Sequence, residues 1–308
     1  MSAKKQRKAF TFIELIFVIV IMGIVGGMTL EVVRQYYEGI YRTQEIMKRT
    51  ETADHILDQL SRYFEYALDS SIVNLDKQGD ANACYGPPIP NDTGDYTVAF
   101  VAVDQDSLRT TSNRPGWSSE VQLGAGNTII ASDANFTEAN DSITGLGSTL
   151  ANSALYDADS ADNNACVRFN LHTGDGMAGY HRISAVNTGT NTLTLNTENN
   201  ATNGHRKYLL RTGYAFRVDQ NNNGTFYMYT GFRPWTPEDY KTDATKKYLL
   251  AEKVNHFFVD YDISTASTAL SGKVWRLKVC MQGLDENLSD SNDDTRQICR
   301  ERSVHVRF

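Results

Sequence analysis

A long hydrophobic run lies close to the start of the chain. Residues 10–30 are almost entirely apolar, and Glu14 is their only charged side chain. A helix of about 20 apolar residues is long enough to span the hydrocarbon core of a membrane. Between positions 53 and 68, apolar residues recur at steps of three and four, which is the period of an amphipathic helix. Because no proline interrupts residues 10–86, the pattern predicts one helix from about residue 10 to 72.

The rest of the chain shows the patterns of β-structure. Short runs of alternating, β-branched or aromatic residues are separated by Gly, Asn, Asp and Pro, as in strands joined by turns. The turn sequence Asn-Asn-Gly at 222–224 predicts a hairpin over residues 208–232. Residues 104–206 are rich in Asn, Asp, Ser and Thr, and we expect a β-rich elaboration there and no separate helical domain. The further expected strands are residues 96–103, 120–123, 128–131, 167–171, 180–186, 192–195, 249–261, 274–281 and 303–308.

These patterns predict an α+β fold, in which a long N-terminal helix lies on an antiparallel β-sheet that carries β-rich loop elaborations. The chain then divides into a short basic segment, residues 1–9, and an apolar membrane-spanning segment, residues 10–30. Residues 31–75 continue the helix outside the membrane, where its apolar stripe packs on the domain. Residues 76–308 form the globular β-rich domain.

The charged residues are unevenly distributed along the chain. Its 30 Lys and Arg residues and 37 Asp and Glu residues give a formal net charge of -7. Four basic residues lie in the segment 1–9, directly before the apolar run. The positive-inside rule therefore places this segment in the cytoplasm and exports the C-terminal body. That body is acidic, which argues against a nucleic-acid-binding surface over the whole protein, and we expect no nucleic-acid partner.

Two simpler interpretations of the apolar run are an ordinary secretory signal and a plain membrane anchor. A secretory signal has an apolar region of about 7–15 residues that ends at an A-x-A-like site, and residues 10–30 are longer and lack such a site. A plain anchor leaves Glu14 unexplained. A carboxylate inside a membrane helix is costly, so it should have a specific partner.

Residues 8–15, with the sequence Lys-Ala-Phe-Thr-Phe-Ile-Glu-Leu, resemble the processing motif of type IV prepilins and type II secretion pseudopilins. The resemblance implies that a prepilin peptidase removes the basic leader between Ala9 and Phe10, and that the new amine of Phe10 is methylated. Glu14 then becomes the fifth residue of the mature chain. The resemblance also implies that the Glu14 carboxylate pairs with the Phe10 amine of a neighbouring subunit during filament assembly. Ala9 departs from the family pattern, in which Gly precedes the cleaved bond.

Further segments are similar to the J-type minor pseudopilin of type II secretion and to the W-type minor pilin of type IV pili. The resemblance implies a non-catalytic structural subunit with the pilin fold, in the priming or tip complex of a filament. It also implies an anchor in the bacterial inner membrane, with a periplasmic domain. The implied partners are prepilin peptidase, other pilin or pseudopilin subunits and inner membrane lipid. The similar segments are residues 53–68, 213–232, 249–262 and 273–281.

Motifs of enzymes are absent from the sequence. It contains no P-loop, no H-E-x-x-H and no G-x-S-x-G pattern. Residues 174–179 match G-x-G-x-x-G, but the segment that follows favours a strand, whereas a dinucleotide site needs a helix there. We expect no enzymatic activity and no cofactor. The alternatives are a membrane-tethered adhesion module that binds a surface or DNA and, as a third hypothesis, a tethered periplasmic hydrolase.

Two acidic segments partly match the calcium-binding pattern D-x-[DN]-x-[DN]-G. In the first, Asp219, Asn221 and Asn223 stand at the ligand positions, but Thr230 occupies the place of the bidentate Glu. The second, residues 290–301, lacks the central Gly. A hairpin turn and a solvated acidic loop are the favoured interpretations. Some pseudopilins bind calcium, so a calcium site remains an alternative.

The four cysteines, Cys84, Cys166, Cys280 and Cys299, form no C-x-x-C pair, and an even number in an exported chain suits disulfides. Four cysteines allow three pairings. If the last strand extends back from residue 308 without a bulge, Cys280 and Cys299 share one face of a hairpin, and we predict a disulfide between them. Closing a loop of this size stabilises the fold by roughly 3 kcal/mol in the chain-entropy model. The alternatives are four free thiols, or Cys280 paired with Cys84 or Cys166.

Overall fold

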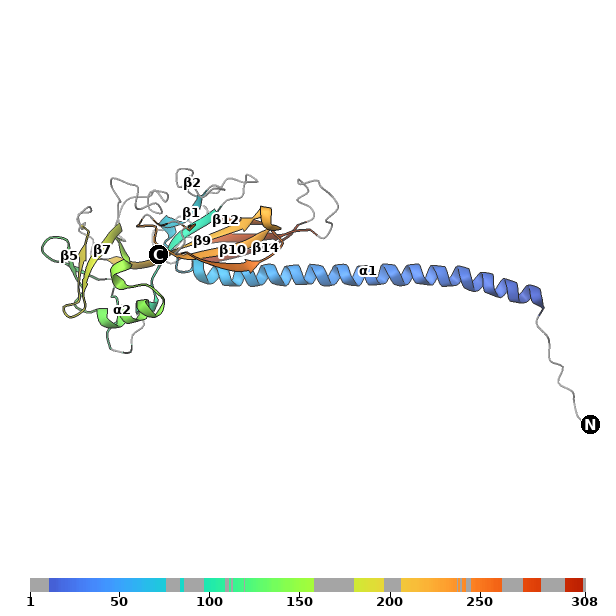
Figure 1. Ribbon diagram of the computed structural model, residues 1–308, viewed down its shortest axis with the longest axis horizontal. Coiled ribbons are helices and arrows are strands. Elements are labelled where there is room, and N and C mark those ends of the chain that lie inside the picture. The colour runs from blue at the N-terminus through green and yellow to red at the C-terminus, as the bar shows by residue number, and fades with distance from the viewer. Residues whose placement is uncertain are drawn as a thin grey trace, which may run out of the picture.

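The protein consists of a long helix, α1 (Phe12–Phe64), and a β-rich domain that covers its C-terminal part (Figure 1). The N-terminal part of α1 projects away from the domain. This arrangement confirms the expected α+β layout of a long helix on antiparallel β-structure. The computed structural model describes residues 11–75, 84–85, 97–108, 111, 113–118, 120–157, 180–196, 206–236, 238, 240–241, 245–261, 274–283 and 297–306.

The larger sheet of the described part of the chain has 11 strands, and all of them pair antiparallel. They are β1 (Val73–Leu75), β2 (Cys84–Tyr85), β3 (Thr97–Val103), β4 (Gln122–Leu123), β5 (Thr128–Ile130), β6 (Ala154–Asp157), β7 (Tyr180–Asn187), β8 (Thr192–Leu195), β9 (Lys207–Asp219), β10 (Thr225–Phe232) and β11 (Lys246–Ala251). Their order is β2-β1-β3-β9-β6-β7-β8-β5-β4, and β10 and β11 branch from β9. The long strand β9 is therefore the centre of the sheet, with β3 on one edge and both β6 and β10 on the other.

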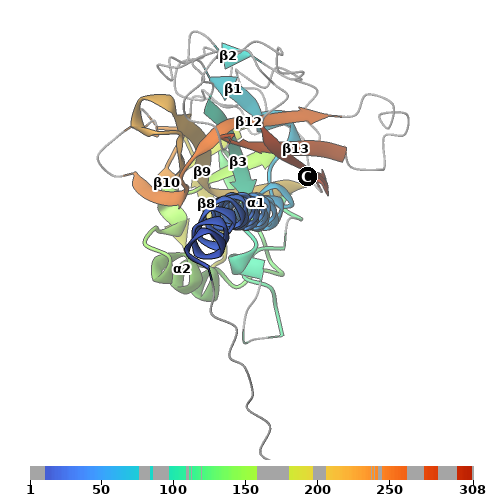
Figure 2. The ribbon, with the colours of Figure 1, turned by 90° about the vertical axis from the view of Figure 1, so that its right-hand side faces the viewer.

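A second sheet of three antiparallel strands completes the domain within the described residues. It consists of β12 (Val254–Tyr261), β13 (Val274–Met281) and β14 (Ile298–His305), in that order. Helix α1 packs on β13 and β14, and it also contributes to the same core as β3, β9 and β10. Figure 2 looks along the helix and shows it below the sheets, with β10 on one side and β13 on the other. The helix thus fills the angle between the two sheets.

The buried stripe of α1 follows the spacing expected from the sequence. Ala53, Ile56, Leu60 and Phe64 are fully buried against the sheets. The ring of Phe64 lies 4.6 Å from that of Phe100 on β3, measured between centroids. Burying one large apolar side chain stabilises a fold by about 1.5–3 kcal/mol. This stripe is therefore the main contact that holds the helix on the domain.

Helix α1 ends at Phe64, which is earlier than the expected end at 72–75. The chain turns there, and the N–H of Leu68 donates to the carbonyl oxygen of Val101 at 2.8 Å. Ala67 also bridges to β3, and both Ala67 and Leu68 are buried. The apolar spacing continues past the helix because burial continues. The backbone, however, has already exchanged helical hydrogen bonds for sheet hydrogen bonds.

The prediction of one continuous strand over residues 249–261 is wrong. It is two strands, β11 and β12, and they belong to different sheets. Lys253 between them adopts a left-handed conformation with φ of 60°. No Gly or Pro marks this turn, so the sequence pattern did not reveal it. The strand expected over 167–171 and the G-x-G-x-x-G segment at 174–179 lie outside the described residues.

The elaboration between β3 and β9 contains a helix that the sequence pattern did not predict. Helix α2 (Phe136–Gly145) begins after Asn135, whose side chain accepts a hydrogen bond from the N–H of Glu138 at 3.3 Å. Phe136 is fully buried, and its ring stacks on Trp117 at 5.8 Å between centroids. With ten residues, the helix is too short for the three- and four-residue period to stand out from the polar sequence around it.

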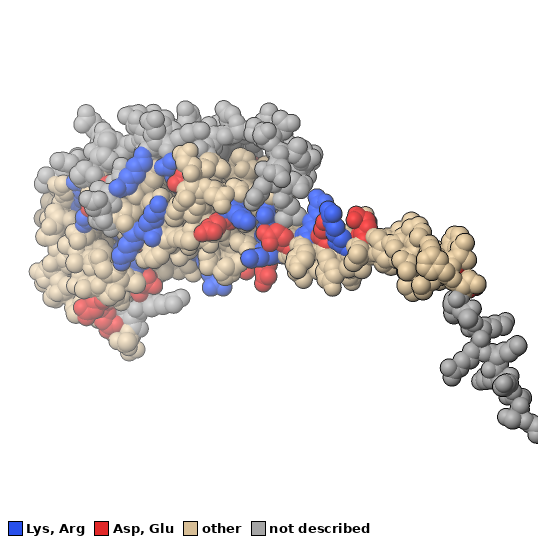
Figure 3. Space-filling view, turned by 45° about the vertical axis from the view of Figure 1, so that its right-hand side comes forward, with Lys and Arg blue, Asp and Glu red and all other residues tan. Residues whose placement is uncertain are grey.

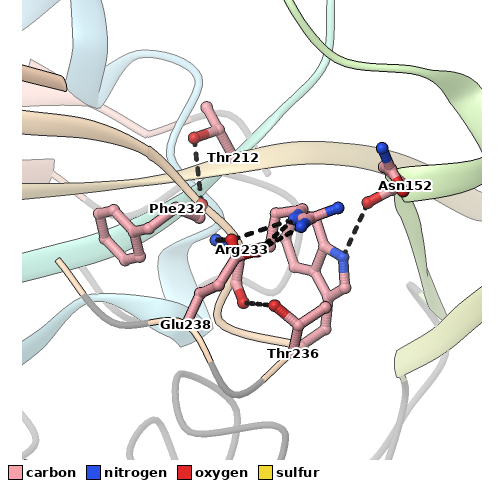
Figure 4. A network of polar contacts seen from close by, with 7 residues as sticks. Asn152, Thr212, Phe232, Arg233, Thr236 and Glu238 are labelled. Atoms are coloured by element: carbon pink, nitrogen blue, oxygen red, sulfur yellow. Dashed lines mark hydrogen bonds and ion pairs between the residues drawn. The ribbon is translucent and has the colours of Figure 1, made fainter. Parts of the chain in front are cut away.

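The segment that follows β10 is held by a polar network around Arg233 (Figure 4). Arg233 Nε donates to Glu238 Oε2 at 3.0 Å, and Thr236 Oγ1 donates to the carbonyl oxygen of Arg233 at 2.8 Å. The indole Nε1 of Trp235 donates to the carbonyl oxygen of Asn152 at 3.0 Å. These bonds fix the buried Trp235 in the core on the face of the large sheet that is turned away from α1.

Candidate functional site

The N-terminal half of α1 presents an apolar surface that no described part of the domain covers. The helix is long and apolar enough to cross a membrane, and none of the residues in its most apolar stretch is buried. Figure 3 shows this outer part largely as an uncharged surface, which gives way to mixed basic and acidic side chains toward the domain. The exposed large apolar residues among residues 12–33 are Phe12, Ile13, Leu15, Ile16, Phe17, Val18, Ile19, Val20, Ile21, Met22, Ile24, Val25, Met28, Leu30, Val32 and Val33.

Glu14 closes the N-terminus of α1. Its Oε2 atom accepts hydrogen bonds from the backbone N–H and from the hydroxyl of Thr11, both at 3.0 Å. A glutamate three residues after the N-cap satisfies backbone donors that have no partner inside the helix. The carboxylate therefore lies at the tip of the helix, beside the first turn. The predicted cleavage residues Ala9 and Phe10 lie outside the described residues.

Beyond its most apolar stretch, α1 continues as a stalk with two different faces. At 3.6 residues per turn, five apolar residues fall within an arc of about 100°. These residues, which we call the stalk stripe, are Val33, Tyr36, Tyr37, Ile40 and Met47. All but Ile40 have about half or more of their surface exposed. The stalk stripe is therefore an apolar surface without a partner among the described residues.

The opposite face of the stalk is polar. Arg34 Nε donates to Glu38 Oε1 at 2.8 Å, and Gln35 Nε2 donates to Glu31 Oε1 at 3.1 Å. Such pairs, four residues apart, stabilise an exposed helix by about 0.2–0.5 kcal/mol each. The centre of this face is about 160° away from the stalk stripe around the helix axis.

The domain packs on the helix on the side of the polar face. Arg49, which follows the same arc, is buried where α1 meets the end of β13. Its Nη1 atom donates to the carbonyl oxygens of Gln282 and Gly283, the latter at 2.6 Å, and its Nε donates to Glu45 Oε1 at 3.2 Å. A buried guanidinium needs such partners, because an unpaired buried charge is strongly unfavourable. With the domain held on this side, the stalk stripe faces away from it.

Ion pairs between α1 and β14 hold the same orientation. Arg300 Nε lies 3.8 Å from Asp54 Oδ1, and the guanidinium of Arg302 contacts the carboxylate of Asp58. Both arginines and both aspartates are partly exposed, so each pair stabilises the fold by about 0–1 kcal/mol. The two arginines lie two residues apart on β14, and the two aspartates lie about one turn apart on α1. The two pairs together therefore keep β14 running along the helix surface.

The predicted disulfide between Cys280 and Cys299 is confirmed. The two residues lie directly opposite each other in the pairing of β13 with β14, with their Cα atoms 4.0 Å apart, and the sulfur atoms are bonded. Lys278 and Glu301, the neighbouring pair on this face, are exposed, so the disulfide lies on the sheet face turned away from α1. The side chain of Cys84 lies outside the described part of the structure, as does Cys166.

The calcium candidates Asp219, Asn221 and Asn223 lie in the turn between β9 and β10. Asp219 Oδ1 accepts a hydrogen bond from the N–H of Asn221 at 3.2 Å, and Asn223 is left-handed, as the turn requires. Among the described residues, no three His, Cys, Asp or Glu side chains gather as a metal site would need. Calcium binding here stays a prediction. Of the second candidate, most residues lie outside the described ranges, and Glu301 pairs with an arginine of β13.

Comparison with known proteins gives one match. The family model of the prokaryotic N-terminal methylation motif matches residues 4–30. No curated protein sequence and no solved structure matches the chain. The matched range contains the basic segment, Ala9, Phe10, Glu14 and the apolar run. Motif and helix together fit a single-pass, membrane-anchored protein. The chain therefore carries the N-terminal methylation motif of prepilin-like proteins, joined to an α+β domain whose layout is consistent with the pilin fold.

Proposed function

We propose that this protein is a minor pilin or pseudopilin, a non-catalytic structural subunit. A prepilin peptidase cleaves it between Ala9 and Phe10, and the mature chain joins other pilin-like subunits at a filament base in the bacterial inner membrane. The matched methylation motif supports the processing step. The observation that carries the assembly step is the stalk stripe.

The stalk stripe extends beyond the reach of the bilayer. The helix from Phe12 to Met47 is about 53 Å long at 1.5 Å per residue, and the hydrocarbon core is only about 30 Å thick. If the helix enters the core at Phe12, the stripe begins about where the core ends and continues for about 20 Å outside it. Large apolar patches that stay exposed on soluble surfaces mark interaction sites. A helix of another subunit is the partner that fits a narrow apolar stripe of this length.

The position of the domain supports this partner. The domain covers the polar side of the stalk. A helix of a neighbouring subunit can therefore contact the stalk stripe without colliding with the domain of the subunit that carries the stripe. Each large side chain buried in such a contact stabilises assembly by about 1.5–3 kcal/mol before the cost of association. The mixed ion pairs on the other face keep that side of the stalk in water.

Glu14 supports a specific register between subunits. Cleavage before Phe10 creates a positive amine close to the depth of this carboxylate in the membrane. A neighbour's amine paired with Glu14 offsets the desolvation penalty of both charges, and it does so at one axial offset only. The hydrogen bonds from Thr11 hold the carboxylate at the helix tip, where such a partner arrives.

Features of the domain support the proposal that this subunit lies at the priming or tip end of a type II secretion pseudopilus or a type IV pilus. Its elaboration, β4 to β8 with α2, adds a third hydrophobic core to the two that lie on the faces of the large sheet. The segments similar to J-type pseudopilins and W-type pilins point to the same place. The basic segment at residues 1–9 supports a cytoplasmic N-terminus and a periplasmic domain.

Two measurements test the proposal. Mass spectrometry of the chain purified from membranes that contain a prepilin peptidase should find a mature N-terminus at Phe10 with a methylated amine. A photo-crosslinking residue at position Tyr37, on the stalk stripe, should capture the N-terminal helix of another subunit. The same residue at Glu38, at the same height on the polar face, is the matched control and should capture far less. An unprocessed Met1 terminus, or equal capture from both positions, would refute the proposal.

A further inference from the structure

A lysine and an aspartate are buried together where the elaboration joins the centre of the large sheet. Lys207, the first residue of β9, and Asp157, the last residue of β6, lie directly opposite each other in the antiparallel pairing of these strands. Lys207 Nζ is 3.2 Å from Asp157 Oδ2, and the two side chains are 0% and 3% exposed. The sequence pattern did not predict this pair, because its members are 50 positions apart.

The pair lies on the side of the sheet that packs into the core of the elaboration. Side chains alternate along a strand, so Asp157 and Lys207 share the face of Leu155 and Leu209. Both leucines are fully buried in that core. Trp117 belongs to the same core, and its Nε1 donates to the backbone carbonyl oxygen of Lys207 at 2.9 Å. The amine and the carboxyl group therefore lie beside an apolar interior, where a pair of charges loses its hydration.

A third titratable side chain, His181 on β7, lies on the same face. It pairs with Leu155, so it is a diagonal neighbour of Asp157 across β6 and β7. Its ring is buried, and neither of its nitrogens has a hydrogen-bond partner in the described structure. Burial is the largest cause that lowers the pKa of His181 from 6.5 to about 4. The ring is therefore neutral at pH 7, and it has a nitrogen that can accept a proton.

The contact between Lys207 and Asp157 brings together the two reactants of an amide bond. If one proton passes from the ammonium to the carboxylate, the pair becomes a neutral amine and a carboxylic acid, which avoids the burial of two charges. The amine nitrogen already contacts the carboxyl group, and reactants held at such a distance react far faster than free molecules in solution. Burial also excludes the water that hydrolysis of the product would need.

We propose that Lys207 and Asp157 condense to an amide bond that links β9 covalently to β6. Lys207 Nζ attacks Asp157 Cγ, so a C–N bond forms and the bond from Cγ to one carboxyl oxygen breaks. His181 accepts a proton from the attacking nitrogen and passes it to the departing oxygen, which leaves as water. One amine and one carboxylic acid thus give one amide and one water molecule, and no oxidant, reductant or cofactor is needed.

The bond would anchor the elaboration to the central strand of the large sheet, and this inference does not depend on filament assembly. It also removes the charges of Lys207 and Asp157. Their effects on the pKa of His181 oppose each other, so burial continues to lower that pKa. The exposed pair of Lys278 and Glu301 has the same directly opposite register on β13 and β14. Water keeps both of those groups charged, so we expect no bond between them.

The test is tandem mass spectrometry of a tryptic digest of the purified full-length protein, after reduction and alkylation of its cysteines. Segment 110–168, which contains Asp157, should be joined to segment 207–211 through the side chain of Lys207. Trypsin does not cleave after a lysine whose amine is acylated, so segment 207–211 stays whole. The joined peptide should weigh less than the sum of its two parts by one water molecule. If the wild type yields only the separate segments 110–168 and 208–211, the proposal is overturned.

Three variants test the assigned roles. Lys207→Arg keeps a cation beside Asp157 but lacks the nucleophilic amine, so the joined peptide should be absent. Lys278→Arg is the matched control and should form the joined peptide like the wild type. His181→Phe keeps a buried ring that carries no proton, and in samples taken at successive times after synthesis it should form the joined peptide about a hundredfold more slowly. Formation at the wild-type rate in His181→Phe would refute the role of His181.

Discussion

Arg49 Nη1 donates to the carbonyl oxygen of Gly283 at 2.6 Å, and this contact joins the middle of α1 to the end of β13. The bond determines more than local stability. It holds the domain on the polar side of the stalk, so that the stalk stripe on the other side stays accessible. Arg49 thus acts together with the buried stripe of α1 to set the helix orientation and the surface available for assembly.

We expect Arg49→Met to destabilise the helix–domain junction by about 2 kcal/mol, because it leaves the carbonyl oxygens of Gln282 and Gly283 without their charged donor. Denaturant unfolding of the domain, followed by tryptophan fluorescence, measures the change. Arg34→Met is the matched control on the exposed stalk, where water screens its ion pair with Glu38, so the effect should be small. Equal effects of the two variants would contradict the role assigned to Arg49.

Glu14→Ala should leave leader cleavage and membrane insertion intact and weaken assembly. The variant removes the only charge of the apolar segment, so insertion becomes easier, while the partner for a neighbour's Phe10 amine is lost. Crosslinking to partner subunits from the stalk stripe measures assembly, and the mass of the N-terminal peptide measures cleavage. Unchanged crosslinking in Glu14→Ala would show that this carboxylate does not set the register.

His181 on β7 should make the elaboration sensitive to acid. Burial and the charge of Lys207 lower the pKa of His181 from 6.5 to about 4, and Asp157 opposes the shift only in part. Neither ring nitrogen has a hydrogen-bond partner in the described structure. The folded state therefore binds fewer protons than the unfolded state between pH 6.5 and about 4, so stability is lost as the pH falls through this range.

By linkage, the loss from His181 is on the order of 3 kcal/mol at pH 4. Thermal unfolding at pH 7 and at pH 4.5 measures it. His181→Phe, which keeps a flat buried ring without titration, should retain more of its stability at the lower pH than the wild type does. A wild type and a variant that lose stability in parallel would show that other groups cause the acid sensitivity.

Gly213 on β9 should not tolerate a side chain. A Cβ atom there would lie 2.5 Å from the ring of Phe232 and 2.9 Å from Pro234. We expect Gly213→Ala to destabilise the fold by about 1–3 kcal/mol, because the buried Phe232 has to move. The control is Gly39→Ala on the stalk, where nothing lies within 4 Å. That change should stabilise the helix by about 0.5–1 kcal/mol, and circular dichroism during thermal unfolding compares the two.

The N-terminal segment and the α+β layout could both be predicted from local features of the amino-acid sequence. The basic residues, the apolar run and Glu14 act through local chemistry, so their meaning does not depend on distant parts of the chain. The face-sharing of Cys280 and Cys299 also followed from the sequence, because side chains alternate along each strand and both strands lie close to each other in the chain. The hairpin of β9 and β10 was marked by its own turn residues.

The ends of the elements and the surfaces that remain open depend on contacts between distant segments, so they became visible only in the folded protein. The spacing of apolar residues indicates which side chains are buried, but it does not indicate which backbone groups hydrogen-bond to each other. It therefore did not show that α1 stops at Phe64 or that residues 249–261 are divided between two sheets. It did not show which side of the stalk the domain covers, because that side depends on Arg49 and on strands more than two hundred residues away. A groove lined by residues of α1, the segment after β3, β9, β10 and β11 arises in the same way, since these residues are distant in the sequence and meet only in the folded domain.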